Sequence, residues 1–226
     1  MKKQSFPFSG RRISEISLSE MLPNVFLNQD NPPSEVWLSQ LSFCRPGLYL
    51  VNAGSGAGKS SLAAYIFGSR TDFAGTLRFD GIDTSGFAID DWQEIRRRHI
   101  AYLPQELSLF PELTALENVQ LKNRLTNHVD DKRIAQWFEK LGIADRMDYP
   151  AGRLSIGQMQ RVAIIRSLCQ PFDFLILDEP VSHLDINNNR IAAEIILEET
   201  RRQDAAIIAT SVGNPIELPY TQQLSL

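Results

Sequence analysis

The strongest constraint on the fold is a glycine-rich segment over residues 51–61, with the sequence VNAGSGAGKSS. The apolar run before it, residues 48–51, is typical of a buried strand, and residues 62–67 are typical of the first turns of a helix. A strand, a glycine-rich turn and a helix that opens on Gly-Lys-Ser form the arrangement of a phosphate-binding loop. The segment therefore predicts an α/β core with an anion site at the start of a helix.

Each residue type in this loop has a physical task. Glycines lack a Cβ atom, so the backbone can take φ > 0 and curl its amides around an anion, and the free N–H groups of the following helix point at that anion. Lys59 supplies a mobile charge for the outer phosphates, and Ser60 supplies a hydroxyl for Mg²⁺. The predicted binding set here is Gly54, Ser55, Gly56, Ala57, Gly58, Lys59, Ser60 and Ser61.

One position departs from the strict motif, because Ala53 stands where a glycine is expected. Alanine is small and fits if its φ angle is negative. The alternative interpretation is a glycine-rich turn that contains Lys-Ser by chance, and the motifs further along the chain argue against it.

The length and net charge of the chain limit the folds and functions that it can have. At 226 residues the chain can form one large α/β domain or one core with an inserted subdomain, and its formal net charge of -4 argues against a general nucleic-acid-binding surface. Cys44 and Cys169 lie far apart, so we expect two reduced thiols in a cytosolic protein, with one structural disulfide as the weaker alternative. The sequence has no apolar run of bilayer length and no secretory signal, so action at a membrane would need another chain.

The order of elements predicts a mostly β beginning, then a core interrupted by helices. We expect strands at 13–18, 25–27, 36–43, 75–81, 99–103, 174–177 and 205–209. We expect helices at 90–98 and 191–200, and a helical pattern with interruptions over 106–170. The tail from Gly213 is expected to be a loop.

Four further segments carry chemistry. Residues 102–105, YLPQ, end a strand with the amide of Gln105, and residues 154–158, LSIGQ, open a helix with Ser155 at the N-cap. Residues 175–180, LILDEP, end a buried strand with two acids, and residues 182–185, SHLD, follow at once. Together with the glycine-rich segment, these motifs resemble the ATP-binding-cassette (ABC) ATPases over nearly the whole chain.

The resemblance implies ATP and Mg²⁺ as ligands. Asp178 resembles the acid that holds Mg²⁺, together with Ser60 and Gln105, and Glu179 resembles the catalytic carboxylate that orients and deprotonates the attacking water. Gln105 also resembles the residue that senses metal and water for a partner. The plainer alternatives are an Asp-Glu turn after a strand and an ordinary loop amide.

The resemblance also implies a dimer of two ABC ATPases, either a homodimer or a heterodimer. Ser155, Gly157 and Gln158 resemble the signature loop that reaches the γ-phosphate held by the opposite subunit. Asp185 resembles the acid that links the two sites, and its alternative role is the N-cap of the following helix.

Two positions depart from the family pattern. Ile156 stands where the signature has glycine, which is tolerated if the side chain faces away from phosphate. Ser211 stands where the family places a histidine that holds the γ-phosphate and the attacking water. Serine offers a shorter hydrogen bond and no cationic form, so slow hydrolysis is compatible with this position.

An aromatic ring that stacks on adenine is expected ahead of the loop. Phe26 is the best-placed candidate and Trp37 a weaker one; the alternative for each is an ordinary core residue.

The resemblance implies a P-loop NTPase (RecA-like) core with an N-terminal antiparallel β subdomain and an inserted α-helical subdomain, in one domain over residues 1–226. The expected division is 11–105 and 171–226 for the β subdomain and core, and 106–170 for the helical subdomain.

Residues 109–119, LFPELTALENV, are similar to those of exporter-type subunits, including lipoprotein-release and cell-division ATPases. The favoured hypothesis is a cytoplasmic subunit, peripheral at the inner face of the cell membrane, that binds and hydrolyses ATP to drive an integral membrane permease on a separate chain. A nucleotide-gated clamp with little hydrolysis is the alternative, which Ser211 favours and Glu179 opposes. A nucleic-acid-bound member of the superfamily is disfavoured by the acidic charge balance.

Overall fold

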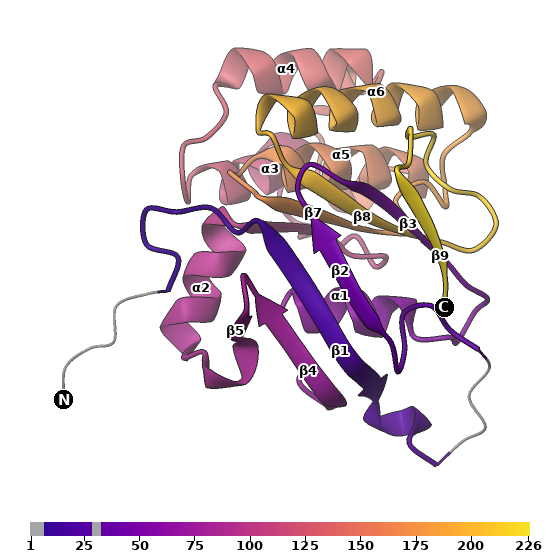
Figure 1. The fold of residues 1–226 in the computed structure, drawn as a ribbon. Helices are drawn as coiled ribbons and strands as arrows, with labels where there is room; N and C mark the ends of the chain where they lie inside the picture. The colour runs from indigo at the N-terminus through magenta and orange to yellow at the C-terminus, as the bar shows by residue number, and fades with distance from the viewer. Residues whose placement is uncertain (1–6, 29–32) are drawn as a thin grey trace.

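The strands form two sheets (Figure 1), as seen in a computed structural model that describes residues 7–28 and 33–226. The antiparallel sheet has the order β2-β1-β4-β5, and the parallel sheet has the order β6-β7-β8-β3-β9. The antiparallel strands are β1 (Glu15–Pro23), β2 (Gln40–Cys44), β4 (Phe73–Phe79) and β5 (Ile82–Asp83). The parallel strands are β3 (Leu48–Asn52), β6 (Ile100–Leu103), β7 (Phe174–Asp178), β8 (Ala206–Ser211) and β9 (Gln222–Ser225).

Six α-helices lie in the described ranges and cover the parallel sheet from two sides. They are α1 (Lys59–Ile66), α2 (Ile89–Arg98), α3 (Ala115–Asn123), α4 (Asp131–Lys140), α5 (Ile156–Leu168) and α6 (Ile186–Arg202). In Figure 1, α3 to α6 lie above the parallel sheet, while the antiparallel sheet and α1 lie below it. Over residues 7–28 and 33–226, no helix combines the length and the apolar character needed to cross a bilayer.

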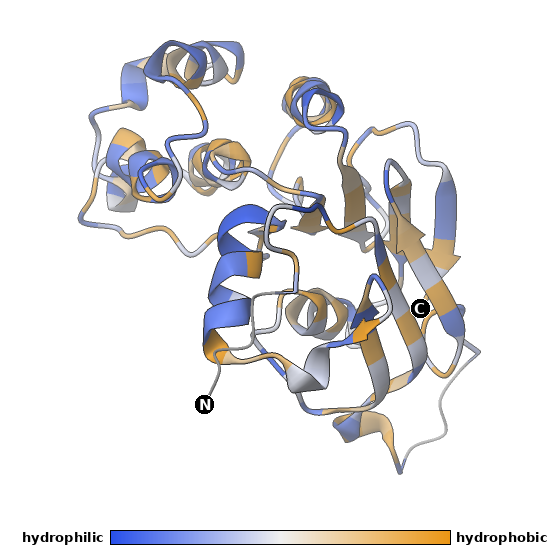
Figure 2. Cartoon of the chain, turned by 60° about the vertical axis from the view of Figure 1, so that its left-hand side comes forward, coloured by the Kyte–Doolittle hydropathy of each residue, from blue (hydrophilic) through white to orange (hydrophobic). Residues whose placement is uncertain are grey.

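Apart from β9, the strands of the parallel sheet are buried on both faces, which explains why they are nearly continuous apolar runs. Along β7, Leu175 and Leu177 face the core that contains α3 to α6, whereas Phe174 and Ile176 face the core that contains α1 and the antiparallel sheet. Figure 2 shows hydrophobic colour over much of the strands and a mixture of hydrophilic and hydrophobic residues on the helices. The parallel sheet therefore separates two hydrophobic cores, one on each of its faces.

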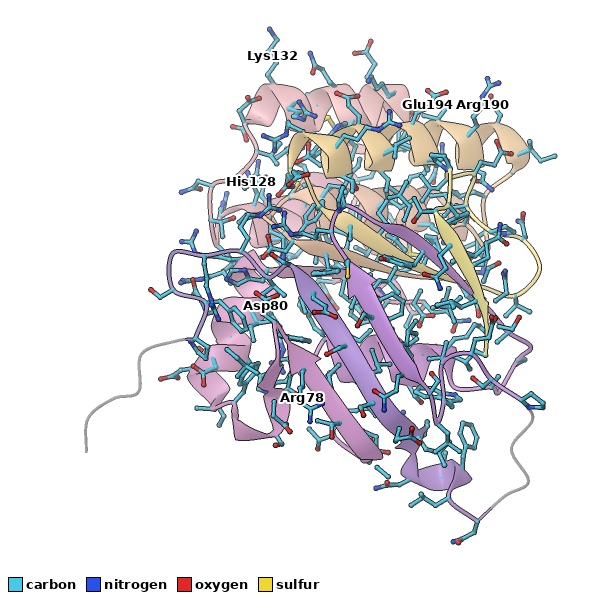
Figure 3. All side chains as sticks on the ribbon, viewed as in Figure 1. Arg78, Asp80, His128, Lys132, Arg190 and Glu194 are labelled. Atoms are coloured by element: carbon cyan, nitrogen blue, oxygen red, sulfur yellow. The ribbon has the colours of Figure 1, made fainter. Side chains whose placement is uncertain are left out.

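The antiparallel sheet begins where the sequence predicts it. β1 alternates inward and outward residues, and its Ile16 lies opposite both Phe43 of β2 and Phe79 of β4. The predicted turn after β4 is present, and the carboxylate of Asp80 accepts hydrogen bonds from the backbone N–H groups of Ser14 and Glu15, each at 2.8 Å. Asp80 lies at the end of β4 in Figure 3. These two bonds tie the hairpin turn to the start of β1.

The helical segment between β6 and β7 begins its helices with side-chain caps. Thr114 and Glu117 form a reciprocal capping box at α3, and Asp130 caps α4. Figure 3 shows Lys132 of α4 pointing away from the body of the protein, which is the hydrophilic side of an amphipathic helix. Its opposite face buries Trp137 and Phe138. The predicted apolar face and the stop at Gly142 are therefore confirmed.

Three sequence predictions of local structure were wrong. The tail was expected to be a loop, but residues Gln222–Ser225 form β9, which pairs in parallel with β3 at the edge of the sheet. Only Leu224 of β9 is buried, so the strand gives almost no hydrophobic pattern. Residues Asn24–Phe26 form a 3₁₀ helix after Pro23, and residues 36–38 lie in a turn before β2.

The two cysteines are free, as predicted. Cys44 is exposed at the end of β2, and Cys169 is buried. Burial raises the pKa of both thiols, so each is a neutral side chain near neutral pH.

Candidate functional site

The glycine-rich loop and the predicted residues Asp178, Glu179 and Ser211 lie where the carboxyl ends of three neighbouring parallel strands, β7, β8 and β3, meet. Asp178 at the end of β7 pairs with Thr210 of β8, and Asn52 at the end of β3 pairs with Ser211 of β8. The glycine-rich loop leaves β3 at this edge, and Glu179 follows β7 at the same edge. Parallel strand order therefore brings segments that are more than a hundred residues apart in the sequence to one place.

The glycine-rich loop has the backbone that a phosphate site requires. Gly56 and Gly58 have φ angles of 82° and 98°, which residues with a Cβ atom rarely adopt. Gly58 is the N-cap of α1 and no side chain caps that end, so the N–H groups of the first turn are open to an anion. Ala53 does not have a positive φ, which confirms that alanine is tolerated at this position.

Lys59 lies between the loop and the catalytic candidate. Its side chain is only 5 % exposed, and its ammonium donates to the carbonyls of Gly54 (2.9 Å) and Ala53 (3.3 Å). The same Nζ atom lies 3.8 Å from Oε1 of Glu179. A cation is thus held at the mouth of the loop, beside a carboxylate.

The loop's three serines have different surroundings. Ser55 and Ser60 are exposed, so their hydroxyls can contact a bound ligand. The hydroxyl of Ser61 accepts a hydrogen bond from Arg70 (3.0 Å), so it already has a partner within the protein.

Two aromatic rings pack against the glycine-rich loop near Gly58. A Cβ atom at Gly58 would lie 3.1 Å from carbon atoms of both Phe26 and Trp37, so both rings pack against this part of the loop. The indole N–H of Trp37 donates to the carbonyl of Ala57 (3.1 Å), and Trp37 is buried. Trp37 therefore braces the loop, while the half-buried Phe26 retains an accessible surface.

Asp178 is oriented by a hydroxyl on the neighbouring strand. Thr210 donates from Oγ1 to Oδ1 of Asp178 at 2.6 Å, and it is the one hydrogen-bond donor to this buried carboxylate among the described residues. Sequence reasoning missed Thr210, although it stands directly before Ser211 at the end of a predicted strand. The carboxylate of Asp178 also contributes, after burial, to raising the pKa of the Tyr102 phenol, which keeps that side chain neutral.

Glu179 has an unusual backbone. Its φ angle is 51°, in the left-handed region. Its N–H donates to Oγ1 of Thr210 (3.2 Å), and its carbonyl accepts a hydrogen bond from the Gln160 side chain (3.3 Å). Gln160 is buried in α5 and was also missed, because nothing in its sequence context shows that it contacts the segment after β7.

The predicted signature residues begin α5. Ser155 accepts a hydrogen bond from the N–H of Gln158 (3.3 Å), and the Gln158 side chain accepts one from the N–H of Ser155 (2.9 Å). A Cβ atom at Gly157 would lie 3.0 Å from the carbonyl oxygen of His183, so glycine permits close packing of α5 on the segment after β7. Ser155 makes no hydrogen bond to residues 51–61, within the part of the chain that the structure describes.

Asp185 caps α6, as the plainer alternative predicted. Its carboxylate accepts hydrogen bonds from the N–H and the side chain of Asn188, each at 2.8 Å. These bonds lower the pKa of Asp185, so the group stays ionised at the start of the helix.

Ser211 and Gln105 occupy contrasting places. The Ser211 hydroxyl is buried, with the residue 2 % exposed, and it has no hydrogen-bond partner among the described residues. Gln105 lies exposed in the turn after β6, the strand beside β7. The structure thus brings Lys59, Asp178 and Glu179 together and leaves Gln105 at the rim.

Over residues 7–28 and 33–226, no three His, Cys, Asp or Glu side chains cluster so as to hold a metal ion by themselves. Asp178 nevertheless fits Mg²⁺, because it is a buried carboxylate with one hydrogen bond and no ion pair to a described residue. Mg²⁺ is commonly bound by one or two protein oxygens together with substrate phosphates and waters. The donor set here has that form.

Comparison with known proteins agrees with this geometry. A family model described as ABC transporter matches residues 46–182. The chain is 34% identical over 171 residues to the lipoprotein-releasing system ATP-binding protein LolD of Novosphingobium aromaticivorans, over 74% of this chain and 76% of LolD. It is 30% identical over 176 residues to the macrolide export ATP-binding/permease protein MacB of Shewanella sp. (strain ANA-3), over 75% of this chain and 26% of MacB.

A solved structure shares the fold. The dimeric structure of MJ0796, described as a bacterial ABC transporter cassette, aligns with a TM-score of 0.73 and 23% sequence identity, over 86% of this chain and 87% of that chain. This likeness confirms the predicted fold class. The match over residues 46–182 and the 34% identity to LolD show that the chain belongs to the ABC transporter family, as an ATP-binding ATPase subunit.

Proposed function

We propose that the chain binds MgATP with its triphosphate in the loop closed by Lys59 and hydrolyses it with Glu179 as the general base. The observation that carries the proposal is the 3.8 Å approach of the Lys59 ammonium to Glu179, next to the Asp178 carboxylate. A cation that fits the outer phosphates, a carboxylate for the metal and a carboxylate for water then share one edge of the sheet.

Each residue has a defined task in this proposal. Asp178, Ser60 and Gln105 would hold Mg²⁺, which when bound neutralises charge on the phosphates. Lys59 would exchange its bonds to the loop carbonyls for bonds to the outer phosphates. Glu179 would accept the proton of the attacking water. Phe26 would stack on adenine, since its ring lies beside Gly58 and is only half-buried.

We propose a head-to-tail dimer, with the same chain or another ABC ATPase as partner, in which Ser155, Gly157 and Gln158 cover the far end of the partner's ATP. Exposed apolar side chains support this surface: Ile156 begins α5, and Ile186, which is 82 % exposed, begins α6 beside Asp185. Large exposed apolar residues beside a functional edge are typical of a protein interface.

We also propose that the chain works with an integral membrane permease on a separate chain, in the cytoplasm at the inner face of the cell membrane. The names of LolD and MacB support this, since one is an ATP-binding protein of a lipoprotein-releasing system and the other an ATP-binding/permease protein. This chain spans about a quarter of MacB. We propose the domain division given above, with 106–170 as the helical subdomain.

A groove next to the Gln105 turn suits such a partner. It has a volume of about 430 Å³ and lies between β6, the loop that follows it, and helices α3 and α5. Phe110, which is 54 % exposed, and Leu121 give it apolar walls. Arg166 of α5 donates to the carbonyl of Ser108 (2.7 Å), which holds the loop after Gln105 against the groove.

The groove also contains the ammonium of Lys122. Burial and then the charge of Arg166 lower the pKa of Lys122 to about 8, and its side chain forms no ion pair or hydrogen bond with any described residue. A half-buried ammonium between apolar walls is complementary to a carboxylate on an amphipathic segment. We therefore propose that the permease segment in this groove carries an acidic residue that pairs with Lys122.

Glu179→Gln tests the hydrolytic proposal. Removing the general base is expected to lower kcat by about 10²–10⁴-fold while ATP binding persists, because the amide keeps the size of the side chain but cannot accept the proton. The measurement is steady-state ATP turnover by the purified protein. Glu194→Gln is the matched control, since Glu194 points outward from α6 in Figure 3. A Glu179→Gln protein that turns over ATP at the wild-type rate would refute the proposed base.

Ser211→His tests whether this position slows turnover. A histidine placed at the end of β8 adds a donor near the γ-phosphate, and one well-placed donor is worth about 10²–10³ in kcat, so we expect a rise of at least tenfold. Such a rise would support an ATPase with a weakened position, as opposed to a nucleotide-gated clamp. An unchanged or lower rate, in a variant that still binds ATP, would contradict the role assigned to Ser211.

Photo-crosslinking from Leu121 in intact cells tests the groove. The crosslinked peptide is expected to come from a membrane-spanning protein and to contain an acidic residue. Lys122→Glu should lower the yield of the crosslinked product by about tenfold or more, because the substitution places two negative charges together. Changing the partner's acidic residue to Lys should restore the yield in the Lys122→Glu protein. Crosslinking should also weaken as the pH rises well above 8, where the Lys122 ammonium loses its proton.

Lys132→Glu is the control for the groove, because Lys132 points away from the body of the protein in Figure 3. An unchanged yield with Lys122→Glu, or a crosslinked peptide without an acidic residue, would rule out the Lys122 pair.

A further inference from the structure

The backbone of Glu179 is held in a conformation that it would not adopt alone. A φ of 51° is uncommon for any residue other than glycine, asparagine or aspartate, and it persists only where surrounding groups enforce it. This turn sets the direction of the Glu179 side chain, because χ1 begins from the same Cα atom. The groups that fix this backbone conformation therefore also fix the direction of the Glu179 carboxylate.

Two side chains from different elements form hydrogen bonds to the peptide groups on either side of the Glu179 Cα atom. Thr210 of β8 accepts from the N–H of Glu179 at 3.2 Å, while its own proton goes to Asp178. Gln160 of α5 donates from Nε2 to the carbonyl of Glu179 (3.3 Å) and to that of Pro180 (2.6 Å). The backbone on both sides of the Glu179 Cα atom is thus fixed.

Gln160 uses its remaining hydrogen-bonding atom on the same segment. Its Oε1 accepts from the N–H of His183 at 2.9 Å, and the residue is 1 % exposed. All three bonds of this buried amide therefore go to residues 179–183, and none goes to its own helix. An amide buried in this manner is a connector between α5 and the segment after β7.

The helix that supplies Gln160 is the one that Ser155 begins. One turn before Gln160, Gly157 packs closely on the carbonyl of His183. The next residue, Arg161, donates to the carbonyl of Leu141 at the end of α4 (2.8 Å). A displacement of the start of α5 would therefore be transmitted to residues 179–183 through the Gln160 side chain.

We propose that Gln160 is a positioning residue for ATP hydrolysis: it holds Glu179 by its backbone and ties the direction of the Glu179 carboxylate to the start of α5. This rests on the role of Glu179 as base given under Proposed function. Without the Gln160 amide, the Glu179 carbonyl keeps only the longer hydrogen bond from the N–H of Ser182 (3.4 Å), so the turn relaxes and the carboxylate leaves its place beside the Lys59 ammonium.

Gln160→Met tests this inference, because methionine has a similar length and cannot make the three hydrogen bonds. We expect kcat to fall by about 10²-fold, as a displacement of about 1 Å can cost, while the Kd of a fluorescent ATP analogue measured without Mg²⁺ changes by less than about twofold. Gln160→Glu, which keeps an acceptor for His183 but faces two carbonyls with a carboxylate, should lose kcat as well. It also serves as the second variant if Gln160→Met does not fold.

Gln170→Met is the matched control. Gln170 is equally buried just beyond the C-terminal end of α5, and its Nε2 also donates to backbone carbonyls, those of Arg96 and Ile100 at 3.1 Å. We expect Gln170→Met, like Gln160→Met, to lower the midpoint temperature of thermal unfolding. We expect its kcat to stay within about twofold of the wild type, because Gln170 lies outside the site. Equal losses of kcat in both variants would show that Gln160 acts only through stability.

A double-mutant cycle separates this inference from the proposed function. In a Glu179→Gln background, Gln160→Met should change the residual rate by less than about threefold, because its effect passes through the missing carboxylate. An equal loss in both backgrounds, or wild-type kcat in Gln160→Met, would overturn the inference. Wild-type turnover in Glu179→Gln alone would instead overturn the proposed function.

Discussion

A hydroxyl on one strand holds a carboxylate on the next, and the site is arranged around that bond. Thr210 of β8 donates to Asp178 of β7 and at the same time accepts from the backbone of Glu179. The parallel register places these residues opposite each other, and it places the loop of β3 beside them. Because both faces of the sheet are buried, the strand ends have little freedom, and the two acids keep their positions before any ligand arrives.

One helix connects the three surfaces that the proposed function uses. α5 begins at Ser155 in the signature loop, contacts the Glu179 segment through Gln160, and near its end holds the loop after Gln105 through Arg166. A helix is stiff over this length, so these contacts are expected to move together. The proposed partner groove and the proposed catalytic base, Glu179, are therefore linked by one rigid helix.

Much of the site could be predicted because its residues are adjacent in the sequence. The loop at residues 51–61 and the acids at 178 and 179 are short motifs at the ends of apolar strands, so their pattern survives without knowledge of the fold. Thr210 and Gln160 could not be found in this way, since their roles depend on contacts to residues 32 and 19 positions away. The strand β9 was missed for another reason: with a single buried residue, its backbone pairing with β3 is not encoded in a hydrophobic pattern.

The most direct test of this account is an equilibrium titration of the protein with ATP, in EDTA and in Mg²⁺, for the wild type and for Asp178→Asn. The account predicts that ATP binds in both conditions through the loop and Lys59, and that Mg²⁺ strengthens binding in the wild type only. An absence of ATP binding, or the same gain from Mg²⁺ in Asp178→Asn, would contradict the placement of the triphosphate and its metal at this edge of the sheet.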